Sequence, residues 1–318
     1  GGYVVCNGVG VQDVLVTAGN AKTYTDETGR YYFSLLTTDC TIMASKEGYD
    51  FSPNSIDVTS DDNEKTNINF IATYKLQGYV KSGETPVSEV KVQVGNNITY
   101  TDINGFFSIL GLSGECEVVI EKQGYSFIYD KTISEYTSLQ IQATFGITGI
   151  VKTGNIFISG VVVKYNNIQT TTNANGEFSL SGLTSPAVIT FEKQGYEFED
   201  CGEISAPANI NVSATYSLSG IVKSGITPIS AVSVTYNGKT ILTNSNGEFN
   251  ISGIIGEITI SFEKIGYTFE TVTIFESKSI IVYATFSVSG KITLGDNPLS
   301  GVLISCQNKT ALTDENGN

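Results

Sequence analysis

The sequence of 318 residues predicts an all-β protein, built as a tandem array of about 70-residue sandwich domains. Three observations carry this prediction. A turn of the form Thr-Asx-x-x-Gly occurs five times, apolar residues on both sides of it alternate with a period of two, and only three residues separate one copy from the next. Fixed-interval copies are typical of small repeated domains, and a period of two is typical of strands with one buried face.

The repeated turn ends in glycine in every copy. The five glycines, which lie 76, 71, 71 and 70 residues apart, are Gly29, Gly105, Gly176, Gly247 and Gly317. Asp or Asn at the second position can accept hydrogen bonds from its own backbone, and glycine supplies the positive φ that a type I turn with a following bulge needs. The pattern therefore predicts a hairpin turn at each glycine.

Two further motifs recur in each complete copy. Lys-x-Gly-Tyr occupies 46–49, 122–125, 193–196 and 264–267, and Ala-Thr-aromatic closes the copy at 72–74, 143–145, 214–216 and 284–286. Alternating runs such as Val90, Val92 and Val94 precede them, and no segment has a helical period. Because the motif tyrosine is present in every complete copy, we expect a structural corner residue instead of a sugar-binding platform.

The closing motif sets the predicted domain boundaries. These place repeat 1 at 1–74, repeat 2 at 75–145, repeat 3 at 146–216, repeat 4 at 217–286 and an incomplete repeat 5 at 287–318. Each junction carries one apolar residue midway, at Leu76, Ile147, Leu218 and Val288. Junctions this short leave no flexible linker, so we expect each domain to pack against the next and the array to be stiff.

Repeat 5 ends directly after its Asn-Gly turn, before the strands that would complete a sandwich. An incomplete sheet has unpaired edges. We therefore expect one of two arrangements. Either the sequence is an excerpt from a longer array, or a neighbouring subunit donates the missing strands, which would build a filament.

Composition excludes several classes of function. The chain has 18 basic and 32 acidic residues, a formal charge of -14, and no histidine. Such acidity repels nucleic acid, and no apolar stretch is long enough for a membrane span. The absence of histidine removes the commonest general base and transition-metal ligand. We therefore expect no enzyme activity and nominate no catalytic, cofactor-binding or metal-binding residue.

The Asx-containing turns have one competing interpretation, as the beginning of calcium loops. Such loops supply oxygen ligands at alternate positions and end in a bidentate glutamate. Each turn here offers at most two acidic side chains and no distal glutamate. A structural turn is therefore favoured.

Five cysteines cannot all pair within one chain. Cys40, Cys116 and Cys306 fall in core-facing columns, where a buried thiol is expected. Cys6 ends the first strand, and Cys201 follows an acidic cluster in a predicted loop. Our hypothesis is that any disulfide uses Cys6 or Cys201 and joins neighbouring chains.

The order of motifs resembles the carboxypeptidase regulatory-like domain, a transthyretin-like and Ig-like sandwich. The resemblance rests on Ser-Gly-x-Val, Val-x-Val, Thr-Asx-x-Asn-Gly-x-Phe and Lys-x-Gly-Tyr in that order, over four complete copies and part of a fifth. It implies a non-catalytic module that occurs beside enzymes and, in tandem, in secreted and cell-surface proteins of microbes. It implies no particular ligand.

The chain also resembles the collagen-adhesin B-type repeat, whose family forms Lys to Asn isopeptide bonds beside a buried acid. The corresponding candidates are Lys81, Lys152 and Lys223 with Glu121, Glu192 and Glu263. Each lies one residue from a core position, so alternation points it outward. We therefore expect no isopeptide bond.

These observations together predict an extracellular structural protein, a stiff stalk or a fibre or filament subunit at a microbial cell surface. Its expected partners are further copies, end to end or side by side. A second hypothesis is an adhesin arm with a cell-wall, glycan or protein ligand, for which five extra residues of repeat 1 around 50–67 are the best candidate. A third is an accessory array of a secreted enzyme.

Overall fold

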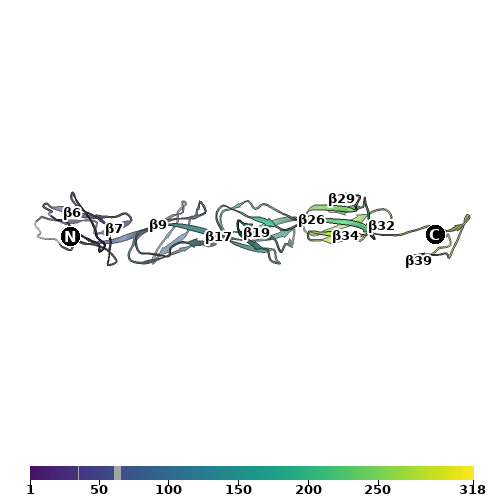
Figure 1. The fold of residues 1–318 in the computed structure, drawn as a ribbon, viewed down its shortest axis with the longest axis horizontal. Helices are drawn as coiled ribbons and strands as arrows, with labels where there is room; N and C mark the ends of the chain where they lie inside the picture. The colour runs from purple at the N-terminus through teal and green to yellow at the C-terminus, as the bar shows by residue number, and fades with distance from the viewer. Residues whose placement is uncertain (35, 61–65) are drawn as a thin grey trace.

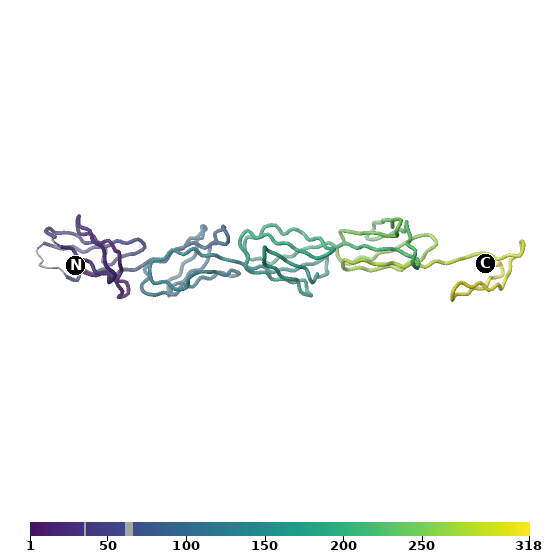
Figure 2. The backbone as a smooth tube through the Cα atoms, in the orientation of Figure 1, coloured from purple at the N-terminus to yellow at the C-terminus, as the bar shows by residue number. Residues whose placement is uncertain are grey.

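The computed structural model describes residues 1–34, 36–60 and 66–318, and this part of the chain is all-β without a helix. Part of the segment with extra residues in repeat 1, at 61–65, lies outside the described residues. Figures 1 and 2 show repeats 1 to 4 as compact units in one line, with an extended stretch of chain leading to repeat 5 at the far end.

Each of repeats 1 to 4 folds from short strands, and the longest strands cross from one repeat into the next. Repeat 1 contains β1 (Gly2–Cys6), β2 (Val9–Gly10), β3 (Leu15–Ala18), β4 (Ala21–Tyr24), β5 (Arg30–Tyr31), β6 (Cys40–Ser45), β7 (Tyr49–Ser52), β8 (Ile56–Val58) and the beginning of β9 (Phe70–Ser82). Repeat 2 adds β10 (Thr85–Pro86), β11 (Lys91–Val94), β12 (Asn97–Tyr100), β13 (Phe106–Leu112), β14 (Cys116–Glu121), β15 (Tyr125–Ile128), β16 (Thr132–Ile133) and the beginning of β17 (Thr137–Thr153).

The later repeats follow the same order. Repeat 3 adds β18 (Ile156–Phe157), β19 (Val162–Tyr165), β20 (Ile168–Thr171), β21 (Glu177–Leu183), β22 (Ala187–Val188), β23 (Thr190–Glu192), β24 (Tyr196–Phe198), β25 (Glu203–Ile204) and the beginning of β26 (Ala208–Ser224). Repeat 4 adds β27 (Thr227–Pro228), β28 (Ser233–Tyr236), β29 (Lys239–Leu242), β30 (Glu248–Ile254), β31 (Ile258–Glu263), β32 (Tyr267–Thr268), β33 (Val272–Ile274), β34 (Lys278–Tyr283) and β35 (Thr285–Phe286). Repeat 5 has β36 (Thr293–Leu294), β37 (Asn297–Pro298), β38 (Leu303–Cys306) and β39 (Lys309–Leu312).

Repeat 2 illustrates the sandwich. One sheet has the order β12-β11-β14-β16, and the other forms around β9 and β17, which run parallel, with β13 antiparallel to β9 and β15 antiparallel to β17. Val90, Val92 and Val94 are at most 2% exposed, so the alternation read from the sequence does face the core. Strands with one apolar face bury it against a second sheet.

The structure corrects the prediction that the repeated glycines are hairpin turns. Around Gly105, the preceding strand β12 pairs with β11, whereas the following strand β13 pairs with β9 in the other sheet. The same holds for β20 and β21 and for β29 and β30. The turn is tight, with the Gly105 N–H donating to the Asp102 carbonyl at 2.9 Å, but it is a corner between sheets.

Glycine is required at this corner for two reasons. All five copies have φ between 69° and 78°. A Cβ at any of them would lie 2.3–2.6 Å from the backbone oxygen of the aligned first-strand residue, Val4, Val80, Val151, Val222 or Ile292. A side chain would therefore push the corner away from the strand beneath it.

The threonine that begins each corner is buried, and its hydroxyl hydrogen-bonds two backbone groups. These residues, 3–5% exposed, are Thr25, Thr101, Thr172, Thr243 and Thr313. In each copy the hydroxyl oxygen accepts the backbone N–H eleven residues earlier at 2.9 Å and donates to the carbonyl fourteen residues earlier at 2.6–2.8 Å. The hydroxyl thus satisfies two backbone groups that no strand partner reaches.

Substitution of Thr172 by valine should lower the free energy of unfolding of repeat 3 by about 1–3 kcal/mol, because the Val161 N–H and the Ile158 carbonyl lose their partner. The matched control is Thr171→Val, at the exposed neighbouring position. Hydrogen exchange of the repeat 3 amides in the full chain measures both. Equal loss of protection in the two variants would contradict a stabilising role for the hydrogen bonds of the Thr172 hydroxyl.

Candidate functional site: the joints between repeats

The strands that close one repeat begin the next without a break. The predicted boundaries after Tyr74, Phe145 and Tyr216 all fall inside β9, β17 and β26, which are 13, 17 and 17 residues long. Through these strands the central sheets merge into one 16-stranded sheet. We call the contact around each such strand a joint, named by the repeats it connects.

The closing aromatic residues of repeats 1 to 3 are buried in the repeat that follows each of them. Tyr74, Phe145 and Tyr216 are each 1% exposed. Phe145 belongs to an apolar cluster formed by residues 145–214, and Tyr216 to one formed by 216–284. Leu112, Leu183 and Ile254, at the ends of β13, β21 and β30, are the strand partners of the three aromatics. The closing aromatic therefore fills the core of the repeat that follows it.

The aliphatic residue two positions later completes this contact. Leu76, Ile147 and Leu218 are at most 1% exposed, which confirms that the middle residue of the junction is packed. The fourth junction differs, because Phe286 is 62% exposed and Val288 is 85% exposed. Among the described residues, repeat 5 supplies no equivalents of β13 and β14 to cover them.

Two of the closing aromatics also hydrogen-bond inside the next repeat. The Tyr216 hydroxyl donates to the Gly256 carbonyl at 2.8 Å, and it lies 3.2 Å from that of Ile274. Tyr74 makes the same contact with the Gly114 carbonyl at 2.5 Å. Burial, followed by the charges of Tyr196 and Glu257, raises the pKa of Tyr216 to about 12. Phe145 fills the corresponding place without a hydroxyl.

The tyrosine of Lys-x-Gly-Tyr packs across the joint. Tyr125 contacts the core of repeat 2 and that of repeat 3, and Tyr196 contacts those of repeats 3 and 4. Their rings lie 6.0 Å and 5.9 Å from the rings of Phe145 and Tyr216. The Tyr196 hydroxyl accepts the Ser277 N–H at 3.3 Å. The expected corner residue is therefore a bridge between two domains.

The glycine of the same motif lies directly against the next repeat in repeats 1 to 3. A Cβ on Gly48, Gly124 or Gly195 would lie 1.9–2.7 Å from Tyr136, Pro207 or Ser277 in the next repeat, and φ is +79° at all three. Their carbonyls accept the N–H groups of Lys75, Gly146 and Ser217 at 2.9, 3.3 and 3.0 Å. Gly266 has a similar φ of +84° but no heavy atom within 4 Å of its Cβ position.

The lysine of the motif holds the corner to its own repeat. In each complete copy its Nζ donates to the backbone carbonyl 34 residues earlier, at Gln12, Ser88, Ser159 and Ser230. Lys46, Lys122 and Lys193 also lie 5.3–5.9 Å from the ring of the motif tyrosine. The sequence showed the motif, but its contacts depend on segments that are distant along the chain.

Buried hydroxyls at the ends of β9 and β17 also connect neighbouring repeats. The Ser185 N–H donates to Ser82 Oγ at 3.1 Å across joint 2–3, and the Gly256 N–H donates to Thr153 Oγ1 at 3.0 Å across joint 3–4. Ser82 and Thr153 are 1% exposed. In repeat 1 the aligned residue is Cys6.

Cys6 and Cys201, the two cysteines that we expect to cross-link chains, are both at least partly buried. Cys6 is 8% exposed and packs in the joint core, so its thiol reaches another chain only if the joint opens. Cys201 is half-buried, and burial followed by the charges of Asp200 and Glu199 raises its pKa, which lowers its thiolate fraction. All five cysteines are free in this structure, and cross-linking stays a prediction.

The other cysteines are less buried than their columns predict. Cys40 and Cys116 are half-buried, and Cys306 is exposed. Cys306 lies in β38, whose four residues are all exposed. Among the described residues of repeat 5 no second sheet covers this strand, which explains the difference.

The acidic side chains of the corners accept hydrogen bonds from the backbone of the same turn. Asp26 Oδ1 accepts the N–H groups of Thr28 and Arg30, each at 2.9 Å, and the Thr28 hydroxyl at 2.7 Å. These bonds lower the pKa of Asp26. Within 1–34, 36–60 and 66–318, no three His, Cys, Asp or Glu residues gather as a metal site would require.

Three of the six isopeptide candidates lie near oppositely charged side chains outside the candidate set. Lys81 Nζ lies 3.8 Å from Glu84, Glu121 pairs with Lys91 at 3.3 Å, and Glu192 pairs with Lys164.

Within residues 1–34, 36–60 and 66–318, the structure contains no helix with the length and apolar character of a membrane span.

Comparisons with known proteins give one partial relative. The chain is 29% identical over 197 residues, or 52% of its length, to the chitinase ChiA of Flavobacterium johnsoniae, and this match spans 12% of that protein. No family model matches the sequence, so the resemblance to the carboxypeptidase regulatory-like domain stays a prediction.

Solved structures with weak similarity include two pilins. The shaft pilin SpaA of Lactobacillus rhamnosus GG is 10% identical with a TM-score of 0.22, over 46% of this chain and 98% of that one. The major pilin BcpA of Bacillus cereus is 9% identical at 0.24, over 67% and 99%. The TIE protein of Bacillus anthracis is 12% identical at 0.23, over 86% and 68%. All three TM-scores are below 0.5, so we infer nothing about this chain from these structures.

The raised pKa of Tyr216 predicts alkaline weakening of joint 3–4. The folded pKa exceeds the ordinary value of about 10, so the stabilisation is complete below about pH 10 and is lost as the pH rises through about 12. Between about pH 9 and pH 11.5, the urea midpoint of repeat 4 should fall more in the unaltered chain than in Tyr216→Phe. Tyr100→Phe, at an exposed tyrosine, is the control. An equal fall in all three proteins would contradict the assignment.

Proposed function

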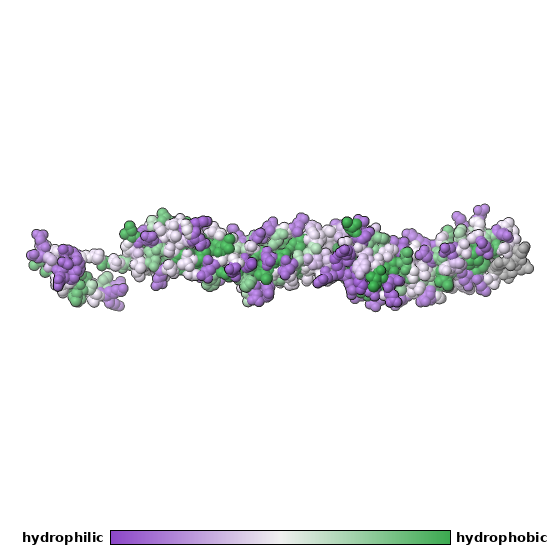
Figure 3. All heavy atoms as spheres, turned by 180° about the vertical axis from the view of Figure 1, so that it is seen from behind, coloured by the Kyte–Doolittle hydropathy of each residue, from purple (hydrophilic) through white to green (hydrophobic). Residues whose placement is uncertain are grey.

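We propose that this protein is a non-catalytic extracellular spacer, a stiff multidomain stalk or fibre subunit at a microbial cell surface. The observation that carries the proposal is the shared strand, because the residue that closes one repeat is also a core residue of the next. Bending a joint would expose Tyr74, Phe145 or Tyr216, and such burial stabilises by about 1.5–3 kcal/mol for each large side chain. Figure 3 shows repeats 1 to 4 in unbroken contact along the rod.

A second candidate function is an accessory array of a secreted enzyme. The partial match to a chitinase favours it, because the matched region is a small part of that protein. The two functions are compatible physically, since a rod can hold a catalytic domain at a fixed distance. A pull-down of the purified chain on insoluble chitin separates a passive spacer, which stays in solution, from an array that binds the substrate itself.

The spacer proposal predicts that a single methyl group at a joint alters the shape of the rod. Gly124→Ala places a Cβ about 2.7 Å from the Pro207 ring, so joint 2–3 should open and the maximum dimension in small-angle X-ray scattering should fall. Gly266→Ala is the control, because it carries similar φ strain, about 1–2 kcal/mol, without a neighbour. If both variants keep the dimension of the unaltered chain, the joints do not set its shape.

A further inference from the structure

The sequence contains six Asn-Gly dipeptides, and the structure places them in two kinds of turn. Four lie at corners between sheets, at 104–105, 175–176, 246–247 and 316–317. The other two lie in two-residue turns between paired strands, at 7–8 and 237–238. Asparagine followed by glycine is especially prone to lose its side-chain amide, because glycine has no side chain to keep its backbone nitrogen away from the asparagine Cγ.

The loss of the amide is a backbone rearrangement that consumes only water. The glycine nitrogen gives up its proton and attacks the asparagine Cγ, a C–N bond forms, and Nδ2 leaves as ammonia. Water then opens the succinimide ring, at the former Cγ to give aspartate or at the main-chain carbonyl carbon to give isoaspartate. Both products add a carboxylate, and isoaspartate also adds a methylene group to the main chain. The glycine nitrogen must therefore be free to ionise and to approach Cγ.

At the corners between sheets the glycine is held by hydrogen bonds on both sides. In repeat 2 the Gly105 N–H donates to the Asp102 carbonyl, and the Gly105 carbonyl accepts the Val80 N–H, both at 2.9 Å. Asn104 is exposed but Gly105 is buried, and the Asn104 N–H donates to Asp102 Oδ1 at 2.8 Å. The corners of repeats 3 and 4 have the same bonds at 2.8–3.0 Å. Ring closure there requires the corner to open.

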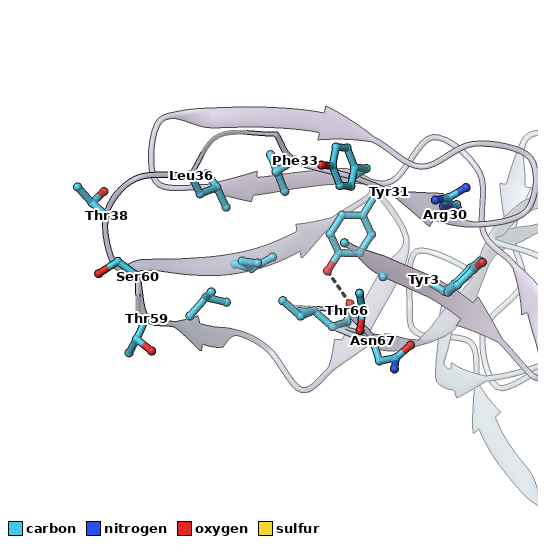
Figure 4. Close-up of a pocket in the computed structure, with 16 residues that line it drawn as sticks. Tyr3, Arg30, Tyr31, Phe33, Leu36, Thr38, Thr59, Ser60, Thr66 and Asn67 are labelled. Atoms are coloured by element: carbon cyan, nitrogen blue, oxygen red, sulfur yellow. Dashed lines mark hydrogen bonds between the residues drawn. The ribbon is translucent and has the colours of Figure 1, made fainter. Parts of the chain in front are cut away.

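The first corner has the same geometry without the reactive amide. Thr28 precedes Gly29, whose N–H donates to the Asp26 carbonyl at 2.9 Å. Figure 4 shows Arg30 and Tyr31, the two residues that follow this corner. The corner therefore accepts threonine in place of asparagine.

The turn at Asn237 and Gly238 lacks the restraints of a corner. It connects β28 to β29, with Tyr236 paired to Lys239, and its two residues have φ of 45° and 73°, as in a type I′ turn. Both residues are exposed, and no heavy atom lies within 4 Å of a Cβ placed on Gly238. In the part of the chain that the structure describes, the Gly238 N–H has no hydrogen-bond partner. Its nitrogen is therefore open to solvent and to the neighbouring Cγ.

The turn at Asn7 and Gly8 has the same conformation but a close neighbour. Its φ values are 48° and 79°. A Cβ on Gly114 of repeat 2 would lie 2.4 Å from Asn7 Nδ2, so this amide rests against joint 1–2. Rotation of the Asn7 amide toward Gly8 must break that contact, which slows ring closure relative to Asn237.

We propose that Asn237 is a site of spontaneous modification to aspartate and isoaspartate, and that the corners protect the asparagines they contain. The modified turn belongs to the sheet β29-β28-β31-β33, whereas the joint strand β26 and its neighbour β34 belong to the other sheet. Figure 1 shows β29 along one side of repeat 4. The chain thus gains negative charge with age while its joints stay intact. This chemistry is independent of the spacer function.

The test incubates the full folded chain at mildly alkaline pH and follows each asparagine by peptide mass spectrometry. The same chain in concentrated urea gives the rate of each residue without the fold. Folding should slow Asn104, Asn175 and Asn246 by at least about tenfold, because their reaction needs local opening, and should slow Asn237 by less than about threefold. Equal slowing of Asn237 and the three corner asparagines would overturn the proposal.

Two matched variants identify the product independently. Ion-exchange chromatography of the aged folded chain should show an early acidic species. Asn237→Gly should abolish this species, because a Gly-Gly pair keeps the type I′ turn but has no amide. Asn104→Thr, which copies the first corner, should leave the species unchanged. If the species survives Asn237→Gly and disappears in Asn104→Thr, the assignment of the modified residue is wrong.

Discussion

The strands that cross the boundaries between repeats constrain the rest of the structure. A residue such as Phe145 is covalently the end of repeat 2 and physically part of the core of repeat 3. A 70-residue sandwich has little apolar area to spare, and a large aromatic side chain is a substantial share of its core. Repeats 2 to 4 therefore depend on the preceding repeat for part of their stability, as expected for arrays with nearest-neighbour coupling.

The other contacts of the joint keep this strand straight. The motif glycines let the corner of one repeat touch the next, and the motif tyrosines cover the closing aromatic from the side. On the opposite edge, Ser82 and Thr153 accept backbone N–H groups from the following repeat. Contacts on two edges of one strand resist bending in both directions, whereas a single edge would form a hinge.

Much of the fold could be predicted because it depends on local periodicity. The valine columns, exemplified by Val90, Val92 and Val94, face the core as alternation requires. The corner glycines have the positive φ that the sequence predicts, but the predicted hairpin is wrong. Local sequence specifies the turn conformation and not which sheet receives the next strand. The role of Thr101 was also missed, because its partners Val87 and Val90 are visible only once the corner is folded.

The joints were predictable only in part. Short junctions with Leu76, Ile147 and Leu218 correctly indicated packing between domains. The sequence could not show that Tyr74 and Tyr216 belong to the next core, since assignment to a repeat by motif order places them in the previous one. Likewise, Gly195 reads as a turn residue, and its contact with Ser277 depends on the relative placement of two domains.

The central claim is that the closing aromatic stabilises the repeat after it. Phe145→Ala in the full chain tests this most directly, because removal of a buried phenylalanine side chain costs about 3–5 kcal/mol. Hydrogen exchange should show the greater loss of protection in residues 178–190 of repeat 3, with the sheet β12-β11-β14-β16 of repeat 2 largely unchanged. A loss centred on repeat 2, with repeat 3 unaffected, would contradict the account.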